Sequence, residues 1–123
     1  MVQQELFERD LEKVGMYGQK SLEVDGFKAL IRRTPMGHLC GYVEVPEDLS
    51  VDTNYIDCHG GVTADQSDVE SFPTTGRYIG FDCAHAGDWT PWHQEGFYRN
   101  YEFVVGEIEG IVRQLKNLEE VTK

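Results

Sequence analysis

Apolar residues in the C-terminal part of the chain recur at steps of three and four, the spacing of one face of an α-helix. This apolar stripe consists of Tyr101, Val104, Val105, Ile108, Ile111, Val112, Leu115 and Leu118. Charged residues fill the other positions, so the pattern predicts a long amphipathic helix packed on a sheet. Gly106 and Gly110 lie four residues apart within it. Either the helix tolerates them, or they allow close approach of a strand or a second subunit.

A shorter helical pattern occupies the other end of the chain. Residues 2–14 are charged and weakly amphipathic. The apolar residues at helical spacing are Leu6, Phe7, Leu11 and Val14. Glycines at 15 and 18 are expected to end this helix, because glycine is a frequent helix terminator.

The middle of the chain reads as strands separated by turn residues. The expected strands are 21–24, 27–33, 38–45, 54–63 and 77–83. Asp25-Gly26 between the first two is a strong signal for a tight hairpin. Residues 64–76 are expected to form an acidic, mobile loop, and residues 84–96 an irregular loop that holds both tryptophans.

The order of these elements predicts an α+β fold in one domain spanning residues 1–123. We expect an antiparallel sheet of about five strands. A long C-terminal helix should pack on one face of the sheet, with a short helix at the N-terminus. A chain of 123 residues is long enough to bury a core of its own.

Strand alternation sorts the polar residues by face, because residues two apart point the same way. In the strand over 77–83, Phe81 and Cys83 share a face and Asp82 points to the other. In the strand expected over 54–63, Cys58 shares a face with apolar neighbours, and His59 points away. Cys58 and Cys83 are therefore interpreted as buried core thiols.

The net charge of the chain limits the classes of partner that it is expected to bind. The chain carries 22 acidic and 11 basic residues, a formal net charge of -11. That balance argues against duplex nucleic acid and against anionic membranes, since both need basic surfaces. A small anionic ligand held by a few local arginines remains compatible with it.

The cysteines and the lack of targeting segments indicate the compartment. Cys40, Cys58 and Cys83 are odd in number and form no C-x-x-C pair. No apolar run resembles a signal peptide or a membrane span. These features predict a soluble cytoplasmic protein with free thiols.

The richest chemistry lies in residues 80–88, GFDCAHAGD, where Asp82, His85 and Asp88 are separated by small residues. If neighbouring strands bring His59 to the same place, three interpretations stand. The side chains could form a metal site of two histidines with one or two carboxylates. They could perform acid–base chemistry through His59 or His85, oriented by Asp82. They could also satisfy one another and shape a loop around a ligand.

Groups suited to a nucleotide are scattered along the chain. Gly60-Gly61 could present backbone N–H groups to phosphate, although the pair could equally mark a bulge or strand end. The chain has no P-loop, dinucleotide-binding or nucleophile-elbow motif. The candidate phosphate partners are Arg32, Arg33, Arg77, Arg99 and Arg113. The aromatic residues that could either stack on adenine or cover the sheet edge are Trp89, Trp92, Phe97, Tyr98 and Tyr101.

Three segments together resemble a family of small proteins found in many phage genomes. They are PMGHLCGYV at 35–43, HGGVT at 59–63 and GFDCAHAGD at 80–88, the last being the most specific. The resemblance covers roughly residues 27 to 118. The family is similar to the Thoeris anti-defence sponges, which bind cyclic ADP-ribose-type signals made by bacterial TIR enzymes.

The resemblance implies a phage protein in the host cytoplasm that holds such a signal without cleaving it. It also implies a homo-oligomer with ligand pockets between subunits and no cofactor. The candidate ligand-binding residues are Arg32, His59, Gly60, Gly61, Arg77, Phe81, Asp82, His85, Asp88, Tyr101 and Arg113. Two alternatives stay open: a small hydrolase or phosphodiesterase using His59, His85 and Asp82, with or without a metal, and an interaction module that acts through its acidic face.

Overall fold

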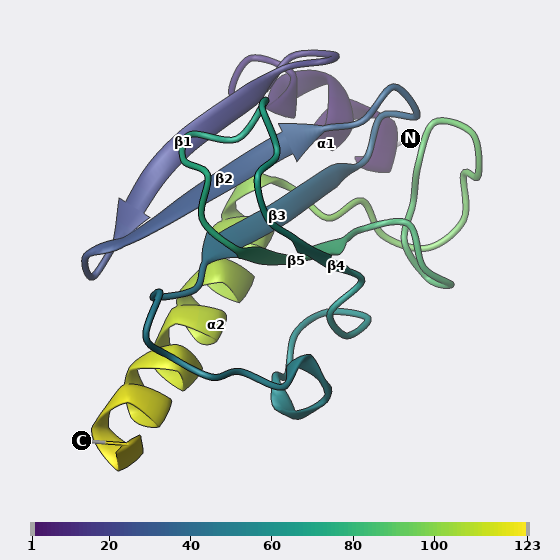
Figure 1. The fold of residues 1–123 in the computed structure, drawn as a ribbon. Coiled ribbons are helices and arrows are strands. Elements are labelled where there is room, and N and C mark those ends of the chain that lie inside the picture. The colour runs from purple at the N-terminus through teal and green to yellow at the C-terminus, as the bar shows by residue number, and fades with distance from the viewer. Residues whose placement is uncertain (1, 123) are drawn as a thin grey trace.

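The computed structural model describes residues 2–122 and shows one five-stranded antiparallel sheet with a long helix across one face (Figure 1). The strand order is β1-β2-β3-β5-β4. The strands are β1 (Gln19–Val24), β2 (Phe27–Arg33), β3 (Leu39–Glu44), β4 (Ala64–Gln66) and β5 (Tyr78–Asp82). The helices are α1 (Val2–Asp10), the 3₁₀ turn η1 (Thr53–Tyr55) and α2 (Tyr101–Thr122). The α+β class and the arrangement of helices predicted from the sequence are confirmed.

The hairpin between β1 and β2 forms where the sequence predicts it. Val24 pairs with Phe27 across the two-residue turn. Both turn residues have positive φ, 49° at Asp25 and 85° at Gly26. This backbone matches the right-handed twist of the strands, which is why Asp-Gly is favoured there.

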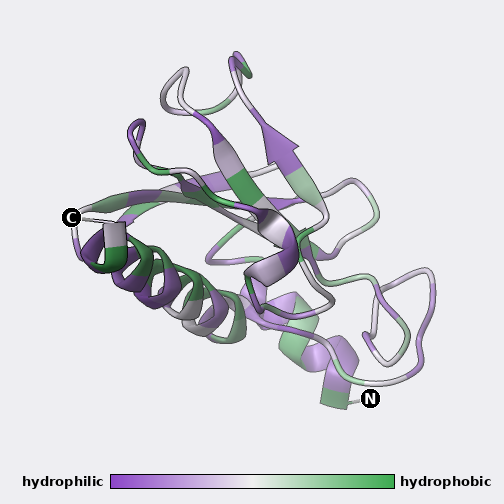
Figure 2. Ribbon diagram, turned by 60° about the horizontal axis from the view of Figure 1, so that its bottom comes forward, coloured by the Kyte–Doolittle hydropathy of each residue, from purple (hydrophilic) through white to green (hydrophobic). Residues whose placement is uncertain are grey.

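The main core lies between α2 and the inner face of the sheet. Ile108 and Ile111 on α2 are fully buried, as are Ile31, Val43 and Ile79 on the central strands. Figure 2 shows α2 with hydrophobic and hydrophilic residues on different sides of the helix. The three- and four-residue spacing of the apolar stripe therefore places its buried members against the sheet.

The face assignment of β5 is also confirmed. Phe81 and Cys83 belong to the main core, whereas Tyr78 packs on the opposite face with Leu30 and Phe72. Phe72 comes from the segment expected to be only a mobile loop. That segment contains β4 and covers the outer face of the sheet, because an uncovered Leu30 and Tyr78 would expose apolar surface to water.

The prediction of one strand is wrong. Residues 54–63 form no strand; η1 is followed by an irregular path and a turn at Gly60 and Gly61, with φ of 71° and 79°. Two consecutive positive φ angles are incompatible with an extended strand. The fifth strand is instead β4, which begins at Ala64. Likewise α1 ends at Asp10 rather than at residue 14.

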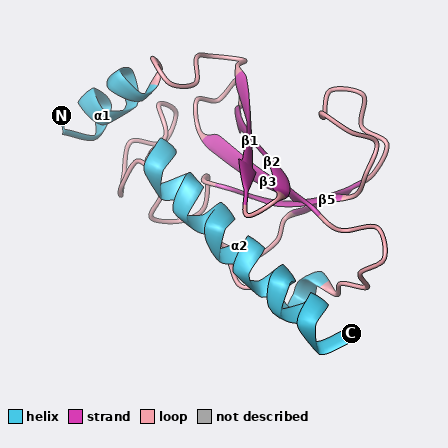
Figure 3. Cartoon of the chain, turned by 90° about the vertical axis from the view of Figure 1, so that its left-hand side faces the viewer, coloured by secondary structure: helices cyan, strands magenta, loops and turns pink. Residues whose placement is uncertain are grey.

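The helices α1 and α2 lie beside the sheet in Figure 3, and the side chain of a buried arginine connects both to the end of β2. Arg33, 1% exposed, donates to the carbonyl oxygens of Val14 at 2.7 Å and Gly37 at 2.8 Å. It also donates to Tyr98 Oη and to the Asp10 carboxylate. Each guanidinium nitrogen thus has a partner, as a buried charge requires.

No helix within residues 2–122 has the length and apolar character needed to cross a membrane.

Candidate functional site

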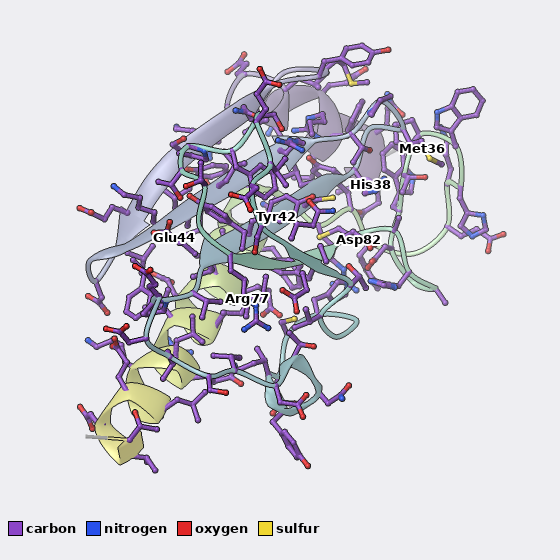
Figure 4. All side chains as sticks on the ribbon, viewed as in Figure 1. Met36, His38, Tyr42, Glu44, Arg77 and Asp82 are labelled. Atoms are coloured by element: carbon purple, nitrogen blue, oxygen red, sulfur yellow. The ribbon has the colours of Figure 1, made fainter. Side chains whose placement is uncertain are left out.

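Polar side chains gather where β5 ends and the chain turns into the 84–100 loop. Asp82, the last residue of β5, and His38, just before β3, both lie at this end of the sheet (Figure 4). The gathered residues are His59, Asp82, His85, Asp88 and Arg99, and we call them the His59–Asp88 cluster. Burial lowers the pKa of nearby His38, although the neighbouring carboxylates Asp82 and Asp88 oppose that shift.

Asp88 is the centre of the cluster. Its side chain is 0% exposed, and its oxygens lie 2.9 and 2.8 Å from His59 Nε2. Arg99 Nε donates to it at 2.8 Å, and the backbone N–H of His85 donates at 3.0 Å. Burial alone would raise the pKa of Asp88, but these hydrogen bonds outweigh it and lower the pKa below its ordinary value.

His59 is held from several directions. Its ring packs edge-on against Phe103, with centroids 5.1 Å apart. Its backbone N–H donates to Glu107 Oε1 at 2.7 Å. Two residues before His59, the backbone of Asp57 is held by Gln114. The Gln114 side chain accepts from the Asp57 N–H and donates to the Asp57 carbonyl, both at 2.8 Å. Side chains of α2 therefore fix this irregular segment where a strand partner is missing.

His85 packs directly over the glycine turn. A Cβ built on Gly60 would lie 2.2 Å from His85 Nε2, so any other residue at position 60 would require the ring to shift. His85 Nε2 lies 3.3 Å from Asp82 Oδ1, an ion-pair distance, yet it is buried without a hydrogen bond of acceptable geometry. Asp82 meanwhile accepts from Thr63 Oγ1 and from the Ala84 N–H, both at 3.1 Å. The two side chains are therefore within ion-pair distance, but their geometry is not that of a hydrogen bond.

A hollow of about 620 Å³ lies beside His59, between residues 57–59 and the outer side of α2. We call it the α2 groove. Its lining comprises Asp57, Cys58, His59, Gly106, Glu107, Gly110, Arg113, Gln114 and Asn117. A Cβ on Gly106 would meet nothing within 4 Å, and one on Gly110 only the Arg113 side chain at 3.6 Å. No strand approaches these glycines within residues 2–122, so they widen the groove.

The structure brings together about half of the residues predicted for the site. His59, Gly60, Asp82, His85 and Asp88 belong to one neighbourhood. Arg113 lines the adjoining groove. The Gly61 N–H is used internally, because it donates to the carbonyl of Cys58 at 2.9 Å.

The other four predicted residues lie elsewhere. Arg32 contacts Phe72 on the outer face of the sheet, with its guanidinium 4.8 Å from the ring. Arg77 pairs with Asp65 at 2.8 Å and lines a separate hollow. Phe81 is buried in the core. Tyr101 is the first residue of α2, and the centre of its ring lies 5.0 Å from Lys20 Nζ.

Several residues that build the site were not in the predicted set. The sequence indicates Arg99 only as a candidate phosphate partner and Glu107 only as a charged residue off the apolar stripe of the helix, and it gives Phe103 and Gln114 no role. The one available signal is periodic. Glu107 and Gln114 are seven residues apart, about two helical turns, and therefore lie on the side of α2 that also carries Gly106 and Gly110.

The thiols are poor nucleophiles in this setting. Burial raises the pKa of Cys58 and of Cys40 to about 11. The pKa of the fully buried Cys83 is raised further by the same cause. Thiols with such pKa values stay protonated at neutral pH. Over residues 2–122, no group of three or more His, Cys, Asp or Glu side chains is placed to hold a metal ion.

Comparisons with protein-family models, curated proteins and solved structures found no match to this chain.

Proposed function

We propose that this protein is a phage anti-defence protein that binds a cyclic ADP-ribose-type signal, or a related cyclic nucleotide, and holds it without cleaving it. The ligand class comes from the motif resemblance of residues 59–63 and 80–88. The observation that carries the proposal is that both motifs meet in the His59–Asp88 cluster, at the wall of the α2 groove.

The groove offers the polar groups that such a ligand needs. The Arg113 guanidinium suits a phosphate oxygen, bidentate where the geometry allows. The side-chain amides of Gln114 and Asn117 can both donate to and accept from ribose hydroxyls. The absence of side chains at Gly106 and Gly110 lets a ligand approach the helix backbone closely.

The internal pairing of the cluster favours binding over turnover. Asp88 is engaged by three donors, and the thiols are protonated at neutral pH. A pre-organised set of hydrogen bonds reduces the entropy lost on binding. A sequestering protein must bind tightly, and a nanomolar dissociation constant corresponds to about 12 kcal/mol. Enclosure of the open groove by a second subunit would add to the buried ligand surface.

The test is retention and release. The protein is incubated with cyclic ADP-ribose isomers, separated from free ligand, heat-denatured, and the released compound is identified by mass spectrometry. Intact ligand supports sequestration. Arg113→Gln should weaken retention, whereas Arg77→Gln, which changes an arginine outside the groove, should not. Release of no compound, with the candidate signals unchanged, would contradict the proposal and favour an interaction module.

A hydrolase or phosphodiesterase is the second candidate, favoured by one observation. Asp88 holds His59 through Nε2, so the other ring nitrogen, Nδ1, is free to act as a base. In that case the same incubation would release an altered compound at more than one equivalent per protein. Asp88→Asn should then lower turnover and shift its pH profile, and this result would replace the sequestration proposal.

A further inference from the structure

The hairpin fixes which backbone groups of β1 point out of the sheet. Val24 and Phe27 close the two-residue turn as a hydrogen-bonded pair, so such pairs recur at every second residue. The Arg33 N–H donates to the Gly18 carbonyl at 2.9 Å, in the same phase. The backbone N–H and C=O groups of every second residue, beginning with Gln19, therefore point away from β2.

These outward groups are available to another strand. β1 is the terminal strand of the sheet and lies at its outer margin in Figure 1. Gln19, Ser21 and Glu23 are exposed, and their backbone groups have no partner outside the sheet among residues 2–122. β1 has six residues in uninterrupted register without proline or bulge, whereas the opposite edge strand, β4, has three. A long edge of this kind is a template for strand addition.

A hollow of about 290 Å³ lies beside this edge, and its lining comprises Ser21, Leu22, Glu23, Lys28, Ala29 and Pro73. The Leu22 side chain packs against the main core, so its neighbours Ser21 and Glu23 project on the opposite, outer face. Pro73 and the methylene stem of Lys28 give the hollow apolar walls. Because serine is short, a longer side chain on an added strand can pass over Ser21 into the hollow.

The inner face of β1 offers a second set of contacts. Leu22 and Val24 are half-buried and pack against the main core. Lys20 lies on the same face, exposed, with its Nζ 5.0 Å from the Tyr101 ring. An apolar residue facing Leu22 would cover surface that the sheet leaves partly in water. An acidic residue facing Lys20 would complement its charge.

We propose that β1 is the docking edge for an extended peptide of a partner protein, which adds antiparallel to the sheet as a further strand. From its N-terminus, the peptide has a basic residue facing Glu23 and then a β-branched apolar residue facing Leu22. A larger apolar residue follows, facing Ser21 and filling the hollow, and an acidic residue faces Lys20. Backbone pairing supplies the affinity, and the hollow and the two charges supply the specificity.

A second copy of this chain fits the same edge poorly. In the symmetric register centred on Ser21, it would set Lys20 against Leu22 and Gln19 against Glu23. The apolar surface would meet a charge, and the carboxylate would meet no base. The copy would also bring only another serine to the hollow and leave it empty. The edge therefore favours a different chain.

This docking edge is separate from the proposed nucleotide site. It shares no residue with the His59–Asp88 cluster or with the α2 groove. The inference is therefore independent of the ligand.

The test uses the full chain and a labelled, acetylated peptide in the order threonine, lysine, valine, leucine, glutamate, threonine, threonine. Fluorescence anisotropy should give a dissociation constant of about 10–100 µM, because one short strand buries little surface. Replacing the leucine of the peptide by alanine should weaken binding at least about fivefold, because the hollow is then left empty.

N-methylation of the peptide tests the backbone pairing without altering the protein. The leucine faces Ser21, whose N–H and C=O point outward, so the two residues exchange both hydrogen bonds. An N-methyl group on the leucine removes one of them and should weaken binding at least about tenfold. An N-methyl group on the valine replaces an N–H that points away from β1 and should change binding less than about twofold. Equal effects at the two positions overturn the proposed register.

A charge exchange tests the direction of the peptide. The wild-type chain should bind poorly to a peptide whose lysine and glutamate are exchanged. A chain with both Lys20→Glu and Glu23→Lys should bind that exchanged peptide as well as the wild type binds the original. Both residues are exposed, and circular dichroism checks that the variant keeps its fold.

Three outcomes overturn the proposal. The first is no saturable binding of the original peptide up to about 1 mM. The second is binding that ignores the charge exchange. The third is a dimer of the chain, detected by sedimentation and lost in Ser21→Pro, which would assign the edge to a second copy.

Discussion

The carboxylate of Asp10, the last residue of α1, accepts hydrogen bonds from the backbone N–H of Tyr101, the first residue of α2. Its two oxygens lie 3.2 and 3.0 Å from that nitrogen. The same carboxylate contacts the buried Arg33 at 3.4 Å and accepts from the Tyr98 hydroxyl. One side chain thus caps the long helix, where a negative charge is favourable, and neutralises the arginine beneath it.

We expect Asp10→Ala to be among the most destabilising single substitutions in this protein. It leaves the Arg33 guanidinium buried without its counter-charge, which costs about 3–5 kcal/mol. Asp10→Asn keeps part of the hydrogen bonding and should cost less. Urea denaturation measures both. Glu5→Ala, an exposed change on the same helix, should stay within about 0.5 kcal/mol, and a similarly small effect of Asp10→Ala would contradict the capping role.

Asp88 should give the protein a specific acid sensitivity. Its pKa in the folded state is lower than the ordinary 3.8, so the folded state favours the ionised carboxylate. The resulting stability is complete above about pH 4 and is lost as the pH falls through the folded-state pKa. Asp88→Asn lacks this contribution. The wild-type advantage in free energy of unfolding should therefore be largest near neutral pH and shrink in acid.

Asp65→Asn is the matched control for that pH series. Asp65 also has a lowered pKa, caused by its hydrogen bond to Arg77. Its side chain is 44% exposed, and exposed pairs contribute about 0–1 kcal/mol. A pH-independent difference between Asp88→Asn and wild type would show that the carboxylate charge is not what stabilises the cluster.

The glycine turn offers a matched pair of variants. Gly60 and Gly61 both have positive φ, so alanine at either position adds backbone strain of about 1–2 kcal/mol. Only at position 60 would the new methyl group collide with His85. Gly60→Ala should therefore destabilise the protein by a further amount of about 1–3 kcal/mol, measured by thermal or urea unfolding. Equal losses at the two positions would mean that His85 is not fixed over the turn.

Thiol reactivity provides a test that does not depend on stability. With pKa values of about 11 at Cys40 and Cys58, little thiolate exists at pH 8. We expect slow labelling by Ellman's reagent in the native state and three fast equivalents after unfolding in denaturant. Cys58 should react first, since it is only half-buried. Rapid native labelling of Cys83 would contradict its place in the core.

The sheet could be predicted from the sequence because its signals are local. The Asp25-Gly26 turn fixes one hairpin, and alternation on β5 separates Phe81 from Asp82. The failure at residues 54–63 has a physical cause. Ile56 and Cys58 do contact the core, so they alternate as a strand would, but the backbone partner at Asp57 is the amide of Gln114. Because the Gln114 amide makes the hydrogen bonds that a neighbouring strand would make, the alternation of apolar residues does not distinguish this segment from a strand.

The residues of the site also fall into those that the local sequence predicts and those that depend on the tertiary fold. Asp82, His85 and Asp88 could be found because they lie within one short segment of small residues. The roles of Arg99, Phe103 and Glu107 depend on how α2 passes behind that segment. A pattern of apolar residues gives the face of α2 that meets the sheet, and it does not give the neighbour of the opposite face.

The buried Arg33 also determines how early the chain can reach its native fold while it is being synthesised. Its hairpin leaves the ribosome early, but Tyr98 and the helix end capped by Asp10 are translated late. Until they emerge, the arginine side chain lacks its Tyr98 partner and Asp10 has no helix end to cap, so the buried hydrogen-bond network around Arg33 is incomplete. We therefore expect nascent chains that stop before residue 98 to remain protease-sensitive, with native order reached only as the last helix joins the hairpin.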